Sequence, residues 1–297
     1  MLTQRATGFV FTESPLYDAS GGVYFVDLHP SAQVATNPSR MIRLNLATGL
    51  TSVVDSNSGG ANGLFFNTNG QIVSCDRERR QISLRSTGNI AVVQQALATN
   101  FNGTPFNGPN DLVLDSSGGI YFTDPDFENR RSLPDAMYYR SAQGSVTQLA
   151  TGNRPNGVIL SPDGHTLYLA FWGSRTIQAY DVVSPGTLTN SRLFVSLSGN
   201  PDGLTIDPAG NVYGAVGNTV RAWNPSGQEL FQLAMPTGVS ATNVDIGGPD
   251  GKTLFVAGST SLYSVQLNIV PEPASLALFI FGATGIAIVS RRRVALP

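Results

Sequence analysis

Short runs of apolar residues alternate with polar residues along most of the chain, and turn-forming residues separate the runs. Typical runs read Leu-Val-Leu at residues 112–114, Ile-Tyr-Phe at 120–122 and Leu-Tyr-Leu at 167–169, with Gly, Asn, Asp or Pro close by. Runs of this length and spacing are typical of β-strands joined by tight turns. The same Gly, Pro and Asn residues disfavour long helices. We therefore predict an all-β fold for this part of the chain.

The strands belong to a repeated unit. Each unit starts with a polar residue, continues with alternating apolar residues and a turn containing Gly, and reaches a strand with aromatic or β-branched residues. The first residues of the units are Glu13, Asn62, Asn110, Asn156, Asp202 and Asn243, which gives steps of 49, 48, 46, 46 and 41 residues. A period in the forties with four short strands per unit indicates a β-propeller blade. Six repeats predict a six-bladed β-propeller over residues 1–268.

The last repeat ends near Leu267 and lacks an outer strand of its own. Residues 2–10 can supply this strand and close the ring, which removes exposed sheet edges. A β-sandwich would not explain six units in register, and a seven-bladed propeller would need a seventh repeat, which the sequence does not show.

Charge and composition exclude several classes of function. The 297 residues include 18 basic and 20 acidic side chains, which argues against a nucleic-acid-binding protein. A single cysteine, Cys75, cannot form an internal disulfide, and two histidines, His29 and His165, cannot build a His-rich zinc site. Any bound metal ion must therefore be held by oxygen atoms.

The starts of the six repeats share a chemical property. The innermost strand of every propeller blade runs along the central channel, so equivalent positions converge on one axis. All six starting residues carry side-chain oxygens. Turn formation would account for the Asn and Asp residues but not for Glu13. Carboxylate and amide oxygens are the ligands of hard cations such as Ca²⁺, so we expect a divalent cation with a few protein ligands and open positions for water.

Several motifs follow one another in an order that resembles the gluconolactonase / regucalcin / luciferin-regenerating-enzyme family. They are Thr12-Glu13-Ser14-Pro15, Phe106-Asn107-Gly108-Pro109-Asn110-Asp111-Leu112-Val113, Tyr121-Phe122-Thr123-Asp124-Pro125, Arg154-Pro155-Asn156-Gly157, Ser161-Pro162-Asp163-Gly164 and Pro201-Asp202-Gly203-Leu204. The resemblance implies a six-bladed propeller with one divalent metal ion in its channel. The family includes lactonases that open five- or six-membered cyclic esters.

The resemblance also implies functions for particular residues. Glu13 and Asn156 match metal ligands, and Asp202 matches a carboxylate that binds the metal and acts as the general base. Asn110 matches an asparagine that contacts the metal, its water or the substrate, and Asn107 is a further substrate-binding candidate. Ca²⁺ is the first choice of metal, with Zn²⁺, Mg²⁺ and Mn²⁺ as alternatives.

Two features depart from this family pattern. Pro105 stands where a basic residue commonly grips the substrate, and Ser14 replaces a frequent glycine. One of the predicted loop arginines could replace the missing basic contact, although a solvated surface position is the simpler interpretation; these are Arg77, Arg79, Arg80, Arg130 and Arg131. Trp172 either lines the substrate mouth or packs between blades.

The last 28 residues differ from the rest of the chain. Residues 270–273 read Val-Pro-Glu-Pro, the 17 residues from Ala274 to Ser290 carry no charge, and three arginines follow. This length is at the short end for a membrane-spanning helix, and the basic cluster favours the cytoplasmic side. The order resembles the PEP-CTERM sorting signal of Gram-negative bacteria, which implies processing by an exosortase-type enzyme.

We therefore expect residues 269–297 to form a single transmembrane helix. It would anchor an exported protein in the inner membrane before sorting to the cell surface or the extracellular matrix. No apolar stretch typical of a secretory signal is visible in residues 1–11.

Three functions are compatible with these features. The leading hypothesis is an exported, metal-dependent hydrolase of carboxylic ester bonds, in particular a lactonase for a sugar-acid lactone or a similar small molecule. The second is a non-catalytic propeller that binds ligands or partners outside the cell. The third is an enzyme with another reaction, either ester hydrolysis or a strictosidine-synthase-like condensation. The sequence contains no G-x-S-x-G motif, which disfavours a serine hydrolase.

Overall fold

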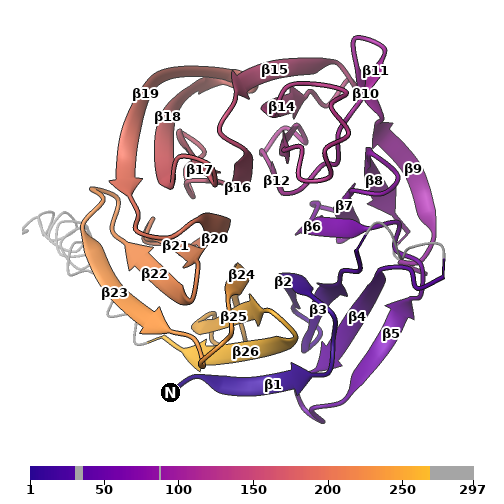
Figure 1. The fold of residues 1–297 in the computed structure, drawn as a ribbon, viewed down its shortest axis with the longest axis vertical. Helices are drawn as coiled ribbons and strands as arrows, with labels where there is room; N and C mark the ends of the chain where they lie inside the picture. The colour runs from indigo at the N-terminus through magenta and orange to yellow at the C-terminus, as the bar shows by residue number, and fades with distance from the viewer. Residues whose placement is uncertain (31–35, 87, 268–297) are drawn as a thin grey trace, which may run out of the picture. The chain divides into compact units, whose positions relative to one another are not determined.

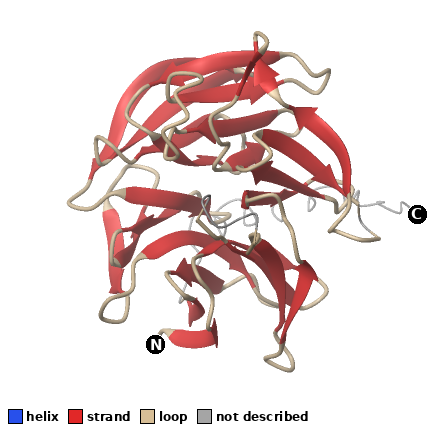
Figure 2. Ribbon diagram, turned by 45° about the vertical axis from the view of Figure 1, so that its right-hand side comes forward, coloured by secondary structure: helices blue, strands red, loops and turns tan. Residues whose placement is uncertain are grey.

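The computed structural model describes residues 1–267 except 31–35 and 87. Six four-stranded antiparallel sheets surround a common axis, which confirms the predicted six-bladed β-propeller (Figures 1 and 2). The described residues contain strands, bends and turns but no helix, and so none that could span a membrane. The predicted C-terminal helix and its sorting signal lie outside the described residues.

Five blades are formed by four consecutive strands each. The first contains β2 (Thr12–Asp18), β3 (Gly22–Asp27), β4 (Arg40–Asn45) and β5 (Thr51–Asp55). The second contains β6 (Ala61–Phe66), β7 (Ile72–Asp76), β8 (Gln81–Arg85) and β9 (Val93–Ala98). The third contains β12 (Leu112–Leu114), β13 (Ile120–Asp124), β14 (Ala136–Arg140) and β15 (Val146–Thr151). The fourth contains β16 (Pro155–Leu160), β17 (Thr166–Phe171), β18 (Thr176–Ser184) and β19 (Thr187–Ser196). The fifth contains β20 (Pro201–Ile206), β21 (Val212–Val216), β22 (Thr219–Trp223) and β23 (Glu229–Ala234).

The sixth blade closes the ring with both ends of the described chain. It contains β24 (Ala241–Gly247), β25 (Thr253–Gly258), β26 (Ser261–Gln266) and, on its outer edge, β1 (Thr3–Thr7). Thr3 lies opposite Ser264 and Thr7 opposite Ser261 in the antiparallel pairing. The predicted closure by residues near the N-terminus is therefore confirmed. A separate two-stranded hairpin, β10 (Asn100–Phe101) and β11 (Thr104–Pro105), precedes the third blade.

Apolar side chains between neighbouring sheets form the core. One cluster joins the third, fourth and fifth blades through residues such as Val158, Leu169 and Trp223, all nearly inaccessible to solvent. Cys75 is also fully buried on its strand. This packing is what the aromatic and β-branched strands of the repeat require, because each sheet can bury both faces only against its neighbours.

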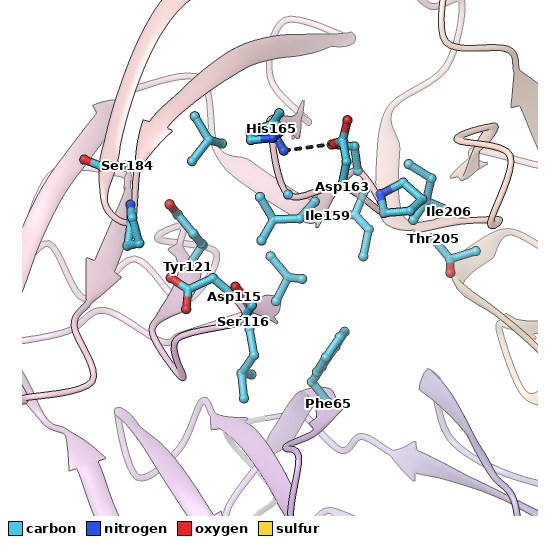
Figure 3. A pocket seen from close by; sticks show the side chains of 18 of the residues that line it. Phe65, Asp115, Ser116, Tyr121, Ile159, Asp163, His165, Ser184, Thr205 and Ile206 are labelled. Carbon is cyan, nitrogen blue, oxygen red and sulfur yellow. Dashed lines mark hydrogen bonds between the residues drawn. The ribbon is translucent and has the colours of Figure 1, made fainter.

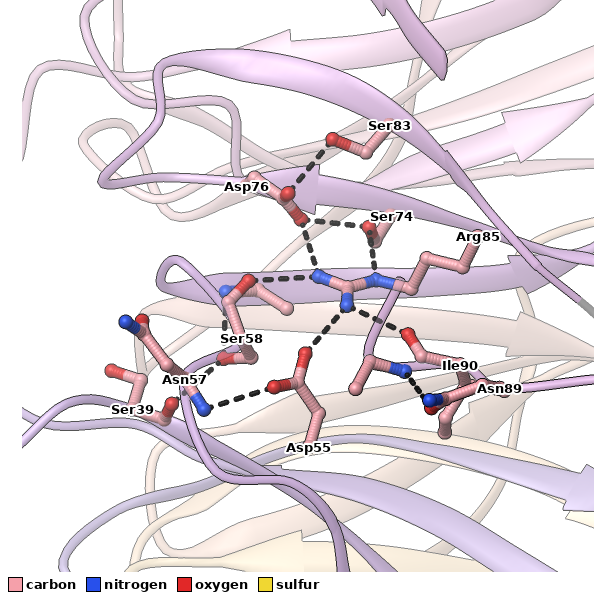
Figure 4. Close-up of polar contacts among 12 residues, drawn as sticks. Ser39, Asp55, Asn57, Ser58, Ser74, Asp76, Ser83, Arg85, Asn89 and Ile90 are labelled. Atoms are coloured by element: carbon pink, nitrogen blue, oxygen red, sulfur yellow. Dashed lines mark hydrogen bonds and ion pairs between the residues drawn. The ribbon is translucent and has the colours of Figure 1, made fainter. Parts of the chain in front are cut away.

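A buried arginine links the first two blades (Figure 4). The Arg85 side chain is 0% exposed, and its guanidinium lies 2.7 Å from Asp55 Oδ2 and 3.0 Å from Asp76 Oδ1. It also donates hydrogen bonds to the Ser58 carbonyl and the Ser74 hydroxyl. Because every charge in this group is paired, the network fixes the angle between the two sheets without leaving a buried ion uncompensated.

The innermost strands share an irregularity at the position where the predicted ring residues lie. The register between the two inner strands shifts between Glu13 and Leu16 in the first blade, and an equivalent shift occurs in the second, fourth, fifth and sixth blades. An extra residue of this kind bends a strand and re-aims its side chains. The repeat start therefore marks a bulge on the inner strand.

Glycines follow several ring residues because the inner strands approach one another closely there. A Cβ atom on Gly157 would overlap the carbonyl oxygen of Asp202 in the next blade, and one on Gly203 would overlap the Asn243 side chain. The Asn-Gly and Asp-Gly pairs of the sequence therefore reflect contact between blades more than turn formation at these positions.

Candidate active site

The bulged inner strands bring oxygen-bearing side chains together at one end of the propeller axis. Glu13 and Asn243 are connected by a side-chain hydrogen bond, and so are Asp202 and Asn156. The Asn243 amide also donates to the Ser14 hydroxyl over 3.2 Å. Four of the six predicted ring residues are thus joined in two pairs. Asn62 and Asn110, on the neighbouring blades, are buried as well.

Asp111 is a further acidic residue of this site that the sequence prediction missed. Its side chain is 7% exposed, and its Oδ1 accepts the backbone N–H of Leu112 over 2.8 Å. The sequence did contain a signal. In three other repeats the residue after the polar start is glycine, whereas here the acidic Asp111 follows Asn110 directly.

Burial raises the pKa values of all three carboxyl groups of the site, and neighbouring negative charges raise those of Asp202 and Glu13 further. Burial raises the pKa of Asp111 to about 7. Burial, and next the nearby Asp111 charge, raise the pKa of Asp202 to about 7, while the hydrogen bond from Asn156 lowers it. Burial and the charges of Asp202 and Asp111 hold the pKa of Glu13 well above its usual range. Such shifts mean that the ionised carboxylates lack a positive partner.

An orphaned oxygen atom lies beside these carboxyl groups. Oδ1 of Asn156 is buried and has no hydrogen-bond donor in the described part of the chain. Buried amide oxygens are nearly always paired, so an unpaired one at a site of mutually repelling carboxyl groups fits a bound cation. Among residues 1–30, 36–86 and 88–267, no three His, Cys, Asp or Glu side chains form a metal-binding group. The donor set that fits is instead two carboxylates, Glu13 and Asp202, with the amide oxygen of Asn156.

Asn107 and Asp124 hold the loop that carries Asn110. Asp124 accepts the backbone N–H groups of Asn107 over 2.8 Å and Gly108 over 2.6 Å, and burial raises its pKa to about 6. The Asn107 side chain is fully buried, donates to the Leu133 carbonyl and accepts two backbone N–H groups of the following loop. These contacts argue for a positioning function of Asn107 in place of the predicted contact with substrate.

The loop arginines proposed as substrate contacts are mostly engaged within the protein. Arg77 pairs with Glu78 and Glu128, Arg79 with Asp76, and Arg130 with Glu78. Arg80 donates to two backbone carbonyls and to the Ser132 hydroxyl, while the Arg131 side chain is exposed. A substrate could bind the guanidinium groups of Arg77, Arg79, Arg80 and Arg130 only by displacing these partners.

Phe171 and Trp172 lie at the end of β17, on the same end of the propeller as the ring. Phe171 is buried in the core. Trp172 is half-buried and contacts Phe127 edge-to-face, with ring centroids 5.8 Å apart. Trp172 therefore packs against a loop of the neighbouring blade while keeping part of its surface accessible.

A cavity of about 550 Å³ opens at the other end of the inner strands (Figure 3). Apolar side chains such as Phe65, Ile159 and Ile206 line it, together with His165 and Asp163. The interior between this cavity and the ring holds a space of only about 50 Å³, which is too small for a sugar lactone. A substrate must therefore reach the ring from the ring's own end of the propeller.

Comparisons with known proteins agree with this geometry. A family model described as "SMP-30/Gluconolactonase/LRE-like region" matches residues 11–260. A gluconolactonase of Zymomonas mobilis is 28% identical over 227 residues, which cover 70% of this chain and 63% of that protein. A lactonohydrolase of Aspergillus oryzae is 30% identical over 209 residues, covering 59% of this chain and 48% of that protein. The chain thus matches between about half and two thirds of the length of these curated relatives.

A solved structure extends the likeness to the whole propeller. A gluconolactonase of Xanthomonas campestris superposes with a TM-score of 0.80 at 25% sequence identity, covering 90% of this chain and 89% of that one.

Proposed function

Because the chain belongs to the SMP-30/Gluconolactonase/LRE-like family, we propose that it is a divalent-metal-dependent hydrolase that opens lactones at the ring of oxygen-bearing side chains. The observation that carries this proposal is the buried, unpaired Oδ1 of Asn156 beside the carboxyl groups of Asp202 and Glu13. The names of the relatives, a gluconolactonase and lactonohydrolases, support a cyclic ester as the substrate.

Glu13, Asn156 and Asp202 would hold the cation, with Asn110 close to it. Oxygen donors of mixed charge suit Ca²⁺ first, whereas Mg²⁺, Mn²⁺ and Zn²⁺ remain alternatives for the same set. A divalent cation in this position supplies polarisation of the lactone carbonyl and a lowered pKa of the attacking water. It would also compensate the ionised carboxylates, whose pKa values are raised by burial first and, for Glu13 and Asp202, by neighbouring negative charges as well.

Asp202 is the proposed general base. Its carboxyl group takes a proton from water as the water oxygen bonds to the lactone carbonyl carbon. The bond between this carbon and the ring oxygen then breaks, and the ring oxygen takes the proton held by Asp202 and becomes a hydroxyl group, which returns Asp202 to its carboxylate form. The hydrogen bond from Asn156 orients the Asp202 carboxyl for this transfer.

The two histidines have partners outside the ring, which disfavours a histidine-assisted mechanism. The His29 ring faces Asp27 and the Asn37 carbonyl, and His165 lines the cavity at the other end of the inner strands. The described part of the chain thus offers no imidazole beside Glu13 or Asp202. The carboxyl group of Asp202 is the available proton acceptor.

We also propose that the protein is exported and tethered through its C-terminus. This proposal depends on the order of Pro-Glu-Pro at 271–273, the uncharged stretch 274–290 and the arginines at 291–293. An exosortase-type enzyme is the partner that such a tail would meet. Cell fractionation of the full chain, with and without residues 270–297, tests it, and an unchanged distribution would contradict it.

A non-catalytic binding module is the second candidate. It is favoured by Pro105 in place of a basic residue and by the internal partners of Arg77 and Arg130. One experiment separates the two. Calcium binding to the EDTA-treated protein is measured by titration calorimetry, and ring opening of a panel of sugar and acyl lactones is then followed with and without the metal. Binding without turnover favours the module, and neither binding nor turnover overturns the metal-dependent function.

A further inference from the structure

Arg154 lies at the mouth end of the fourth blade, next to the proposed metal ligand Asn156. It stands immediately before β16, and its carbonyl accepts the backbone N–H of Trp172 over 3.0 Å. Two residues of extended chain span at most about 7 Å, so the backbone of Arg154 is close to that of Asn156. Arg154 is therefore near enough to the ring to meet a bound substrate.

Two aromatic rings hold its guanidinium group. The central carbon of the guanidinium is 5.5 Å from the ring centroid of Phe127 and 5.5 Å from that of Trp172. Contacts of this kind fix a cation through the faces of the rings and do not consume its N–H groups. The aromatic pair thus orients the guanidinium while its donors stay available.

No carboxylate neutralises Arg154 within the described ranges of the chain. It has no ion pair and no side-chain hydrogen bond there, whereas Arg77, Arg79 and Arg130 each pair with an acidic residue. A half-buried arginine with five N–H donors and no hydrogen-bond acceptor among the described residues is suited to bind an anion from outside.

The backbone supports the same interpretation. Asn153 and Arg154 both have left-handed conformations, with φ of 59° and 50°. Consecutive non-glycine residues in this region are disfavoured and persist where the surroundings hold them in place. Here the pairing of Arg154 with Trp172 holds the turn and directs the arginine to its aromatic neighbours.

We propose that Arg154 is a specificity-determining residue that binds an anionic oxygen group of the substrate, a carboxylate or a phosphate, at the end remote from the ester. The substrate class is then an acidic sugar lactone. This inference rests on the proposed lactonase function.

The test compares lactones of one skeleton that differ in a single group. Glucono-1,4-lactone carries a neutral CH₂OH where glucaro-1,4-lactone carries a carboxylate, and 6-phosphoglucono-1,4-lactone carries a phosphate ester on the same ring. The wild-type protein should have a higher kcat/KM for one of the anionic lactones than for the neutral one. The anionic lactone with the higher kcat/KM shows whether Arg154 binds a carboxylate or a phosphate group.

The decisive variant is Arg154→Gln. It should lower kcat/KM for the preferred anionic lactone by about 10- to 100-fold, mainly through KM, because a hydrogen bond to a charged group is lost. The value for the neutral lactone should stay within about twofold. Arg154→Lys should lie between, since it keeps the charge but not the planar fork. Arg175→Gln is the matched control, an exposed arginine of the same blade that should change neither value.

Equal losses for neutral and anionic lactones would show that Arg154 only packs against its rings, and would overturn the inference. If Arg154→Gln does not fold, the same comparison is made with Arg154→Lys. If no lactone is hydrolysed, the proposed function fails, and Arg154 is judged by binding alone. The wild type must then bind glucarate at least about tenfold more tightly than the neutral polyol glucitol, and Arg154→Gln must lose this difference; equal affinities overturn the inference.

Discussion

At the scale of single residues, the site brings together three carboxyl groups whose pKa values are raised by burial and, for Glu13 and Asp202, by neighbouring negative charges. The ring positions Glu13, Asn156 and Asp202 were predictable because an oxygen-bearing residue recurs at the start of every repeat. Asp111 was not, since its importance depends on the approach of Asp202 from another blade, which a linear pattern does not contain. The paired arginines could not be predicted for the same reason.

The general-base function of Asp202 predicts a specific loss of activity. Asp202→Asn keeps an oxygen for the cation but cannot accept the proton, so kcat for lactone hydrolysis should fall by about 10²- to 10⁴-fold. Calcium affinity should fall less, because one oxygen ligand remains. Steady-state kinetics and calorimetry measure the two effects. Asn62→Ala, at the equivalent ring position of another blade, should cost far less; equal losses would mean that the ring is structural polar packing.

Asp245 predicts how stability depends on pH. It is half-buried on the innermost strand of the sixth blade, accepts the backbone N–H of Tyr17 over 2.8 Å, and has a pKa raised to about 7 by partial removal from water. In the unfolded chain an aspartate has a pKa of about 3.9, so only the folded state keeps this proton between about pH 4 and 7. The stabilisation is complete below about pH 4 and is lost as the pH rises through 7, by up to about 1.4 kcal/mol per unit.

The measurement is urea denaturation from pH 5 to 8 with saturating Ca²⁺, which keeps the ring carboxyl groups in one state. Asp245→Asn cannot ionise, so its free energy of unfolding should fall less over this range than that of the wild type. Asp181→Asn, at an exposed carboxyl with a lowered pKa, should keep the wild-type slope. An unchanged slope in Asp245→Asn would show that Asp245 does not titrate here.

At the scale of elements, the inner strand of each blade determines where the ring side chains point. The strand and its repeat were predictable from alternation and period. The register shift was not, because it depends on how neighbouring inner strands crowd around the axis. Gly157 illustrates this. In the sequence it is part of a turn-like Asn-Gly pair, whereas in the structure it makes room for the Asp202 carbonyl.

Gly157→Ala should therefore disturb both stability and metal binding. The added methyl group would overlap the backbone of Asp202, and relieving such overlap costs about 1–3 kcal/mol. It would also displace Asp202 from Asn156, so calcium affinity should fall in parallel with the urea midpoint. Gly88→Ala is the matched control, because nothing lies within 4 Å of its added Cβ. Similar behaviour of the two variants would contradict the close-approach argument.

At the scale of the whole molecule, the propeller is held together by closure of its ring. The pairing of β1 with β26 joins positions 3–7 to 261–264, so the fold is completed only when both ends of the propeller meet. This long-range contact was predictable because the sixth repeat is one strand short. All four strands of the sixth blade lie between Thr3 and Gln266, within the described residues.

Two deletions test this closure. Removing residues 270–297 should leave a soluble protein with one cooperative melting transition, because all four strands of the sixth blade remain.

Removing residues 1–8 from that shortened chain deletes β1 but retains Phe9, which packs edge-to-face on Phe25 with centroids 5.0 Å apart. The lost strand pairing is worth a few kcal/mol, and each kcal/mol lowers Tm by about 2–4 °C in a protein of this size. We expect a Tm drop of at least about 5 °C and aggregation through the exposed edge of β26. Calorimetry and light scattering measure both. If the second deletion melts like the first, the ring does not depend on β1; if the first one aggregates, the apolar tail belongs to the folded core.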